Sequence, residues 1–284
     1  MLHGCYPSGM PSKRSKRVDI YLLGRGIADG VSQMTVEALD ALRVSRLVFD
    51  LSGDYKAIRK LHPNVVDLQK EYWTGELCDD VYERLQERLL SEAETNGPTI
   101  SVVVDGHPMV FDDVNWGIVR EGKRRGLTVV PLPGISCVDT MMIDLGVDIG
   151  IGAQIVHANH LLTHDITLDP HLQTFVFQIG KFGTSFFSAE TRRNRPGRFT
   201  PLVEHLTRFY PREHVATLIV SSGSGATIRK RVALGALDEA RTFLHRHQDD
   251  GLTMHIPAHP RAPVNEEFTR AIDDERHLAE IAVV

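Results

Sequence analysis

The 284-residue sequence contains few cysteines, and their scarcity argues against two classes of protein. Cys5, Cys78 and Cys137 show no paired spacing, so neither a disulfide framework nor a zinc site is expected. Histidine is abundant, with 14 residues, but no His-Glu-x-x-His pattern accompanies them. Solvated or core histidines are therefore favoured over a metal centre, and no metal ligand is predicted.

Long apolar runs and a surplus of positive charge are also missing. No run approaches the roughly 20 residues needed to cross a bilayer, and residues 1–17 lack the apolar stretch of a signal peptide. The net charge is −5 and the Lys and Arg residues are scattered, whereas a nucleic-acid binder needs a basic face. We therefore expect a cytoplasmic protein that engages neither a membrane nor a nucleic acid.

A repeated strand, loop and helix pattern is present instead. Residues 102–104 form a valine run typical of a parallel strand covered on both faces, and the run soon meets a Gly-His-Pro turn. A helix over 115–125 and a strand over 127–130 follow, and this strand leads into a Pro-Gly loop. In an open α/β sheet, ligands lie beyond the carboxyl ends of the strands, so both loops are candidate sites.

The pattern loosens after Gly150, which suggests more than one domain. We expect a disordered leader, an N-terminal α/β domain, a C-terminal α/β domain and a C-terminal helical extension. The regions are, in that order, residues 1–17, 18–150, 151–262 and 263–284. Within the extension, the charged segment 265–278 favours a single helix.

A glycine-rich loop follows the first expected strand. Gly24, Gly26 and Gly30 resemble a dinucleotide-binding turn, and Asp50 ends the next strand where a ribose-binding acid would lie. Gly30 comes one residue too late for the G-x-G-x-x-G pattern. A tight turn at the sheet edge is therefore the preferred interpretation, and nucleotide binding is the minority one.

Five short motifs, in order, carry a resemblance to a known family. They are "IYLLGRG", "GHPMVF", "PLPGIS", "VFQIG" and "MHIPA", and the resemblance covers residues 18 to about 262. Their order and spacing resemble the tetrapyrrole (corrin/porphyrin) methylases, and within that superfamily the chain looks most like the borosin peptide α-N-methyltransferases. The resemblance implies an α/β fold of two αβα domains, with S-adenosylmethionine (SAM) in the cleft between them.

The same resemblance implies a set of cofactor-binding residues. Glycine would permit close approach in the "GHP" loop, and apolar side chains would wall the cofactor from water. His107 either bonds the cofactor carboxylate or orders its own loop. Gln178, an amide within an apolar strand, either faces the cofactor or lies on the solvent side of an edge strand. The expected cofactor-binding residues are Asp105, Gly106, His107, Val110, Phe111, Ser136, Cys137, Gln178 and Thr253.

The catalytic residues implied by the resemblance are tyrosines. An amide nitrogen is a poor nucleophile, so the enzyme must help remove its proton or stabilise charge on the carbonyl oxygen. Tyr72 and Tyr82 match two tyrosines of the borosin pattern. The arginine of that pattern is replaced by Cys78, and Gln69 stands where another tyrosine is expected. Loss of the cation removes a contribution of roughly 3 kcal/mol to the transition state.

Three functions therefore remain open. The leading one is a SAM-dependent methyltransferase that N-methylates backbone amides of a peptide. The alternatives are a methyltransferase of the same fold that acts on a small metabolite or tetrapyrrole, and a protein that binds SAM or S-adenosylhomocysteine with weak catalysis. Cys78, in place of the arginine, favours the alternatives.

Two partners are expected. Only "AEIAVV" follows the charged segment 265–278, which is short for both a tether and a reactive core, so we expect a separate precursor peptide in trans. A homodimer is also expected, as in the family, because "YWTGELCDDVYERL" offers apolar residues that lack a clear core partner.

Overall fold

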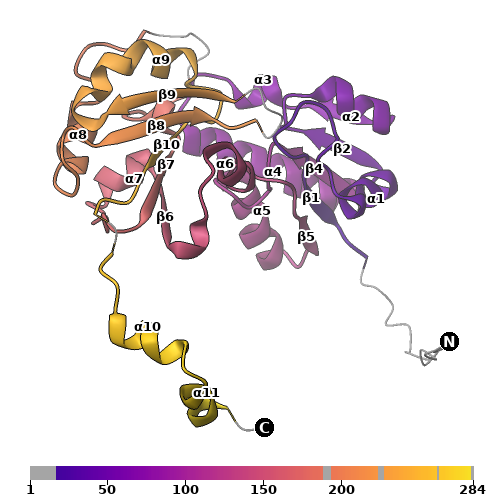
Figure 1. The fold of residues 1–284 in the computed structure, drawn as a ribbon. Helices are drawn as coiled ribbons and strands as arrows, with labels where there is room; N and C mark the ends of the chain where they lie inside the picture. Colours follow the sequence, from indigo (N-terminus) through magenta and orange to yellow (C-terminus); the bar gives the residue numbers. More distant parts are fainter. Residues whose placement is uncertain (1–16, 188–192, 223–226, 261, 283–284) are drawn as a thin grey trace. The chain divides into compact units, whose positions relative to one another are not determined.

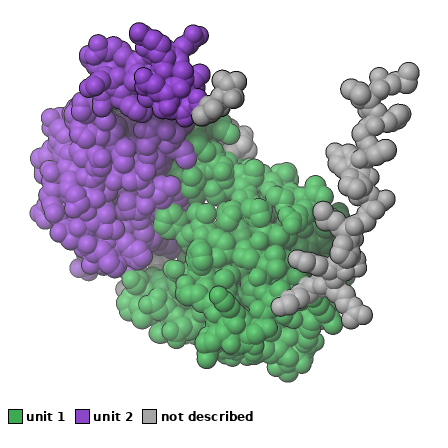
Figure 2. All heavy atoms as spheres, turned by 90° about the horizontal axis from the view of Figure 1, so that it is seen from below, with its two compact units in different colours: residues 1–146, 185–192, 221–226 green, residues 147–184, 193–220, 227–284 purple. Residues whose placement is uncertain are grey.

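The computed structural model describes residues 17–187, 193–222, 227–260 and 262–282. The chain divides into two compact units, coloured separately in Figure 2. The second unit starts at Val147, close to the expected boundary near Gly150, but the described residues 185–187 and 221–222 return to the first unit. Apart from Arg17, the expected leader lies outside the described residues.

The first unit is built on a parallel five-stranded sheet (Figure 1). Its strands follow the order β3-β2-β4-β1-β5, and every pairing in it is parallel. The strands are β1 (Ile20–Gly24), β2 (Leu47–Asp50), β3 (Val65–Asp67), β4 (Ile100–Val104) and β5 (Val129–Leu132). The helices are α1 (Val36–Val44), α2 (Tyr55–Leu61), α3 (Gln69–Tyr72), α4 (Cys78–Asn96), α5 (Asp113–Arg124) and α6 (Cys137–Leu145).

Both faces of this sheet carry an apolar core, as the valine run predicts. Val102 points into the cluster that contains Leu85 and Leu89 of α4, while Val103 points into the cluster that contains Leu42 of α1. Every residue of β4 is buried. Alternate side chains of a strand point to opposite faces, so a central strand covered on both sides has no solvent-exposed position, and the one polar residue of β4, Ser101, is buried and hydrogen-bonded to the Ser45 hydroxyl at 2.7 Å.

Two expected boundaries are corrected by local hydrogen bonds. Helix α5 starts at Asp113 rather than Asn115, because the Asp112 side chain caps it by accepting from the Asn115 amide at 2.8 Å. Strand β5 covers Val129–Leu132 rather than residues 127–130, because the Leu127 amide still bonds the Gly122 carbonyl at 2.9 Å. The hydrogen bond from Leu127 belongs to the end of α5, so the extended backbone of β5 can begin only after it.

The second unit is built on a mixed five-stranded sheet of order β6-β7-β10-β8-β9. Strands β6 and β7 are parallel, and the remaining pairings are antiparallel. The strands are β6 (Ala153–His157), β7 (Gln173–Phe177), β8 (Val215–Val220), β9 (Ile228–Ala233) and β10 (Thr253–Ile256). The expected α/β fold with two sheets is therefore confirmed.

The helices of the second unit are short. They are α7 (Ala158–Thr163), α8 (Thr200–Leu206), α9 (Arg241–Arg246), α10 (Glu266–Ile272) and α11 (Glu275–Ile281), with 3-10 turns η1 (Ile149–Ile151), η2 (Ile179–Lys181) and η3 (Leu234–Ala240). The single helix expected over 265–278 is wrong: the chain breaks at Asp273 and restarts with Asp274, whose carboxylate caps α11 by accepting from the Arg276 amide. No helix in the described ranges is long and apolar enough to cross a membrane.

A buried histidine makes the second unit sensitive to acid. His255 is 5% exposed and bonds the Gln173 side-chain oxygen at 2.8 Å. Burial, with a smaller contribution from His214, lowers the pKa of His255 to about 4 from 6.5. Between these values the unfolded chain binds more protons than the folded one, so stability falls as the pH drops from 6.5 towards 4.

We expect this single group to remove about 3 kcal/mol of folding free energy between neutral and about pH 4. Urea unfolding at several pH values measures this loss of folding free energy. Far-UV circular dichroism follows the transition, because both tryptophans, Trp73 and Trp116, lie in the first unit and their fluorescence does not report on the second. His255→Gln should flatten the pH profile, whereas exposed His164→Gln should leave it unchanged. Equal profiles for the parent and His255→Gln would assign the acid sensitivity to other groups.

Candidate functional site

Three glycines from three loops lie in backbone contact at the carboxyl edge of the first sheet. Gly24 ends β1, Gly106 follows β4 and Gly134 follows β5. A Cβ atom at Gly24 would lie 2.4 Å from the Gly106 carbonyl oxygen and 2.8 Å from backbone atoms of Gly134. Gly26 and Gly106 exchange backbone hydrogen bonds of 3.3 and 3.0 Å. Only glycine permits this approach, so the edge can bring backbone groups close to a ligand.

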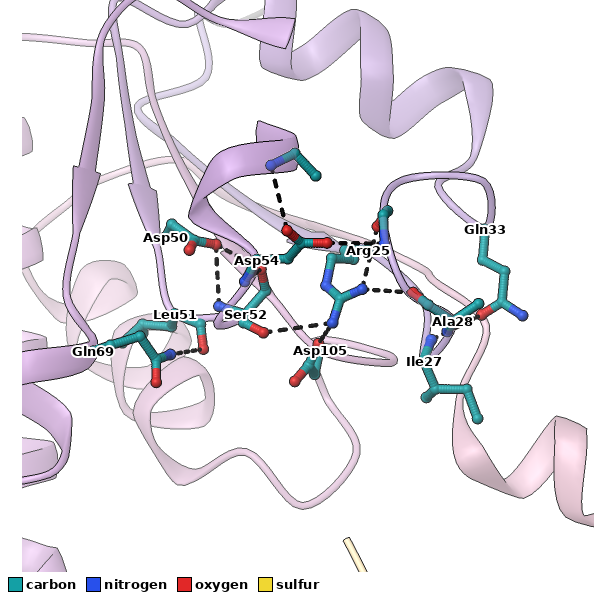
Figure 3. Close-up of polar contacts among 12 residues, drawn as sticks. Arg25, Ile27, Ala28, Gln33, Asp50, Leu51, Ser52, Asp54, Gln69 and Asp105 are labelled. Atoms are coloured by element: carbon teal, nitrogen blue, oxygen red, sulfur yellow. Dashed lines mark hydrogen bonds and ion pairs between the residues drawn. The ribbon is translucent and has the colours of Figure 1, made fainter. Parts of the chain in front are cut away.

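Arg25 ties the loop after β1 to its neighbours (Figure 3). Its side chain is 8% exposed and forms an ion pair with Asp105, the residue after β4. The guanidinium also donates to the Ala28 carbonyl at 2.6 Å, to the Gly30 carbonyl at 3.2 Å and to the Ser52 carbonyl at 3.5 Å. The planar guanidinium group of Arg25 thus links the loops that follow β1, β2 and β4 at the edge of the sheet.

Two further side chains hold the same loop. The Gln33 side-chain oxygen accepts from the backbone amides of Ile27 and Ala28 at 2.8 and 2.9 Å. The Asp54 carboxylate accepts from the Gly30 amide at 2.8 Å, and these groups surround Arg25 in Figure 3. The loop is therefore a turn held by side-chain hydrogen bonds, in agreement with the tight turn predicted from its glycine spacing.

The geometry argues against the dinucleotide interpretation of this loop. Asp50 is fully buried, and one of its oxygens accepts from the Ser52 amide at 3.1 Å and the Ser52 hydroxyl at 2.6 Å. A carboxylate so placed cannot reach a ribose at the sheet edge. Burial raises the pKa of Asp50, against the lowering effect of the Ser52 hydrogen bonds. Within the described ranges, the second Asp50 oxygen and the Arg25 Nε have no hydrogen-bond partner.

The "GHP" loop is ordered by His107 and ends in a left-handed residue. The His107 Nδ1 accepts from the Met109 amide and its carbonyl accepts from the Val110 amide, both at 3.1 Å. These bonds support the loop-ordering role of His107. Phe111 has φ 54°, an uncommon conformation for a bulky residue, and is 42% exposed. Such strain accumulates at functional sites, so Phe111 stays a candidate.

Ser136 and Cys137 begin helix α6 next to the "GHP" loop. A Cβ atom at Gly106 would lie 3.9 Å from the Ser136 Cα, so the two loops are neighbours. The Ser136 hydroxyl and amide both donate to the Asp139 carboxylate at 2.7 Å, in a capping box. Burial raises the pKa of the Cys137 thiol to about 11, so this thiol stays protonated at neutral pH.

Gln178 and Thr253 meet at one edge of the second sheet. Gln178 was expected to lie within a strand. Strand β7 instead ends at Phe177, and Gln178 follows it with φ 57° and ψ 32°. The strand must turn there because the Ile179 amide bonds the Leu252 carbonyl at 3.2 Å, directly before Thr253 in β10. The expectation that Gln178 lies on the solvent side of an edge strand is therefore wrong, because β7 ends at Phe177 and lies between β6 and β10, whereas the contact of Gln178 with the cofactor stays a prediction. Its left-handed backbone is a further mark of a constrained site.

An aromatic cluster surrounds both predicted catalytic tyrosines. Tyr72 ends α3 and Tyr82 lies in α4, with ring centroids 6.2 Å apart. Phe187 lies 4.7 Å from Tyr72 and 5.7 Å from Tyr82, and Trp73 lies 5.2 Å from Tyr72. Phe187 is held by its amide, which bonds the Glu76 carbonyl at 2.9 Å. The sequence places the two tyrosines together correctly and does not reveal Phe187, more than 100 positions further on.

Both phenols are kept protonated. Burial is the largest cause that raises the pKa of Tyr72 and of Tyr82. The charge of Asp112 raises the pKa of Tyr72 further. Burial in turn raises the pKa of Asp112 to about 7. At neutral pH the tyrosines are hydrogen-bond donors and not phenolate bases.

Cys78 and Gln69 lie beside this cluster with structural roles. Cys78 packs against the hydrophobic core of the first unit that contains Leu85 and Leu89, and the Cys78 amide donates to the Ser185 carbonyl at 2.8 Å. Gln69 accepts from the Trp73 indole and donates to the Leu51 carbonyl, both at 2.8 Å. Arg84 does not replace the missing cation, because it pairs with Glu76 at 2.7 Å. In the described part of the chain, no group of three or more His, Cys, Asp or Glu side chains could hold a metal ion.

Comparison with known families identifies the chain. The profile of the tetrapyrrole (corrin/porphyrin) methylases matches residues 19–241. The chain therefore belongs to this family, and the resemblance inferred from the five motifs is confirmed.

Its relatives include borosin-type proteins of fungi. The methyltransferase/ribosomally synthesized cyclic peptide dendrothelin A precursor of Dendrothele bispora is 25% identical over 269 residues, which cover 92% of this chain and 63% of that protein. The corresponding omphalotin A precursor of Omphalotus olearius is 28% identical over 208 residues, which cover 72% of this chain and 49% of that protein. The chain thus spans less than two thirds of these relatives' length.

Solved structures share the fold. A uroporphyrin-III-C-methyltransferase from Thermus thermophilus matches with a TM-score of 0.58 at 17% identity, over 84% of this chain and 91% of that one. A diphthine synthase matches with a TM-score of 0.57 at 18% identity, over 84% and 89%. At this identity the likeness concerns the fold alone.

Proposed function

We propose that this chain transfers methyl groups from SAM to backbone amides of a precursor peptide supplied in trans. The observation that carries the proposal is the pair Tyr72 and Tyr82, partly buried within one aromatic cluster with ring centroids 6.2 Å apart, where burial keeps both phenols protonated. Relatives named both as methyltransferases and as precursors of ribosomally synthesized peptides support the choice of substrate.

The glycine edge of the first sheet fits SAM. When bound, SAM supplies an electrophilic methyl group on a sulfonium, and the side chains here need only position it and exclude water. Gly106 would permit backbone contact, and Val110 and Phe111 would wall the cofactor. Asp105, His107, Ser136, Cys137, Gln178 and Thr253 remain the other proposed contacts.

The tyrosines would act on the amide oxygen. As the amide nitrogen attacks, negative charge develops on its carbonyl oxygen, and protonated phenols can donate hydrogen bonds to that oxygen. Burial keeps the Tyr72 phenol protonated, with a smaller contribution from the charge of Asp112. The aromatic walls of Trp73 and Phe187 strengthen these hydrogen bonds by excluding water.

Helices α10 and α11 are not proposed as substrate. The amides of α10 and α11 are engaged in helices, whereas a methylated amide must lie free and extended. A homodimer and a cytoplasmic location remain predictions from the sequence. Cys78, in place of a cation, favours one second candidate, a methyltransferase with a more nucleophilic small-molecule acceptor.

Mass spectrometry tests the proposal directly. After incubation of the chain with SAM and a panel of apolar peptides, we expect peptide mass gains in steps of about 14 Da, with the chain itself unchanged. Steps mapped to residues 281–284 would contradict supply in trans. Turnover of tetrapyrroles or small amines alone would establish the second candidate, and bound SAM without any product would leave a binding protein.

A further inference from the structure

We propose that a pocket in the second unit binds an acidic segment of the peptide substrate. The pocket has a volume of about 720 Å³ and is lined by Arg193, Asn194, Arg241, Thr242, His245 and Arg246, with Pro196. Three of these residues are arginines and none is acidic. The proposal rests on the proposed function for the peptide nature of the ligand, while the pocket's charge selects its acidic chemistry.

The arginines are available for a ligand. Arg193 and Arg246 are exposed, and neither forms an ion pair or side-chain hydrogen bond with any described residue. Arg241 is only loosely held: it donates to the Asp238 carbonyl at 3.3 Å and lies 3.9 Å from the Asp238 carboxylate, which is too long for a good charge-assisted hydrogen bond. Asp238 is instead occupied by the amides of Gly197 and Phe199, at 2.9 and 3.3 Å.

Hydrogen bonds hold the walls of the pocket in place, although Arg193 and Arg246 have no partner among the described residues. The Asn194 amide group donates to the Arg241 carbonyl at 3.0 Å and so joins the 193–198 segment to α9. Arg198 anchors that segment by donating to the Phe182 carbonyl at 2.9 and 2.6 Å. The buried Nδ1 of His245 has no hydrogen-bond partner among the described residues, which is rare for a buried polar atom. The pocket is thus a fixed basic surface with unused hydrogen-bonding capacity.

The size and charge of the pocket favour a peptide with several carboxylates. Guanidinium groups match carboxylates in bidentate geometry, and three of them can engage neighbouring acidic side chains. A pocket of about 720 Å³ lies in the range of sites for whole small molecules and is much larger than a single oxyanion requires. The chain carries a net charge of −5, so its average surface repels an acidic peptide and this pocket supplies the local attraction.

Fluorescence polarisation without SAM tests the pocket independently of catalysis. The probe is a dye-labelled peptide with a Glu and Asp run, compared with the same peptide carrying Gln and Asn. We expect the acidic probe alone to bind, with an affinity that falls as salt rises. Arg193→Glu and Arg246→Glu should each weaken binding about tenfold, because each replaces a charge-assisted hydrogen bond by repulsion.

Arg229→Glu, at an exposed position of β9 in the same unit, is the matched control and should bind like the parent. No binding by the parent, or equal weakening in Arg229→Glu, would overturn the proposal. Inorganic phosphate that binds as tightly as the acidic probe would also overturn it, since the pocket would then be a plain anion site. Peptide binding without methylation would refute the proposed function and leave the pocket standing.

Discussion

Gly24→Ala is expected to destabilise the first unit by about 3 kcal/mol and to abolish SAM binding. The added Cβ would lie 2.4 Å from the Gly106 carbonyl oxygen and 2.8 Å from the Gly134 nitrogen and Cα. All three atoms belong to the backbone, so no side chain can rotate away. The loops after β1, β4 and β5 would have to separate, and the edge proposed to hold SAM consists of those loops.

Tryptophan fluorescence during urea unfolding measures the stability effect, because Trp73 and Trp116 both report on the first unit. Calorimetric titration with SAM measures the second effect. Gly30→Ala is the matched control: Gly30 has φ +78°, but its Cβ would meet nothing within 4 Å. It should cost about 1 kcal/mol of backbone strain and retain SAM binding. If Gly24→Ala matched Gly30→Ala in both measurements, the backbone contact would have no importance for fold or cofactor.

The strands could be predicted where local pattern and burial agree. The valine run of β4 needs apolar residues at every position, because its two faces contact separate cores, and the sequence reports this directly. Helix and strand ends were less predictable. The starts of α5 and β5 each depend on a single hydrogen bond, one accepted by the Asp112 carboxylate and one donated by the Leu127 amide, and equally plausible alternatives lie one or two residues away.

The site was predictable only in part, since much of it depends on pairing between distant strands. The glycines of the first edge are visible in the sequence, but their contact depends on β1 lying between β4 and β5. Phe187 joins the tyrosines because a segment after η2 returns to the first unit. Gln178 was placed inside a strand because its neighbours are apolar, whereas its left-handed backbone is imposed by the pairing beside β10.

Tyr72→Phe and Tyr82→Phe are each expected to lower kcat for peptide methylation about 100-fold. Each change removes a hydroxyl and keeps the ring, so the contacts with Phe187 at 4.7 and 5.7 Å persist. The free energy of unfolding should therefore change by about 1 kcal/mol or less, and the affinity for SAM should not change. Tyr55→Phe, in α2 of the same unit, is the matched control and should leave kcat unaltered.

The pH profile and the double variant separate hydrogen-bond donation from proton removal. The pKa values of both phenols lie above 10, so a rate that depends on donation should show no phenolate-dependent rise as the pH approaches 10. Because the two phenols share one cluster and are proposed to donate to the same oxygen, the double variant should lose little more than either single one, as groups that act as a unit do. A rate that climbs with phenolate formation would contradict the donor role. Losses that multiply in the double variant would show that Tyr72 and Tyr82 act independently, and the two phenols would then not stabilise the charged amide oxygen as a pair.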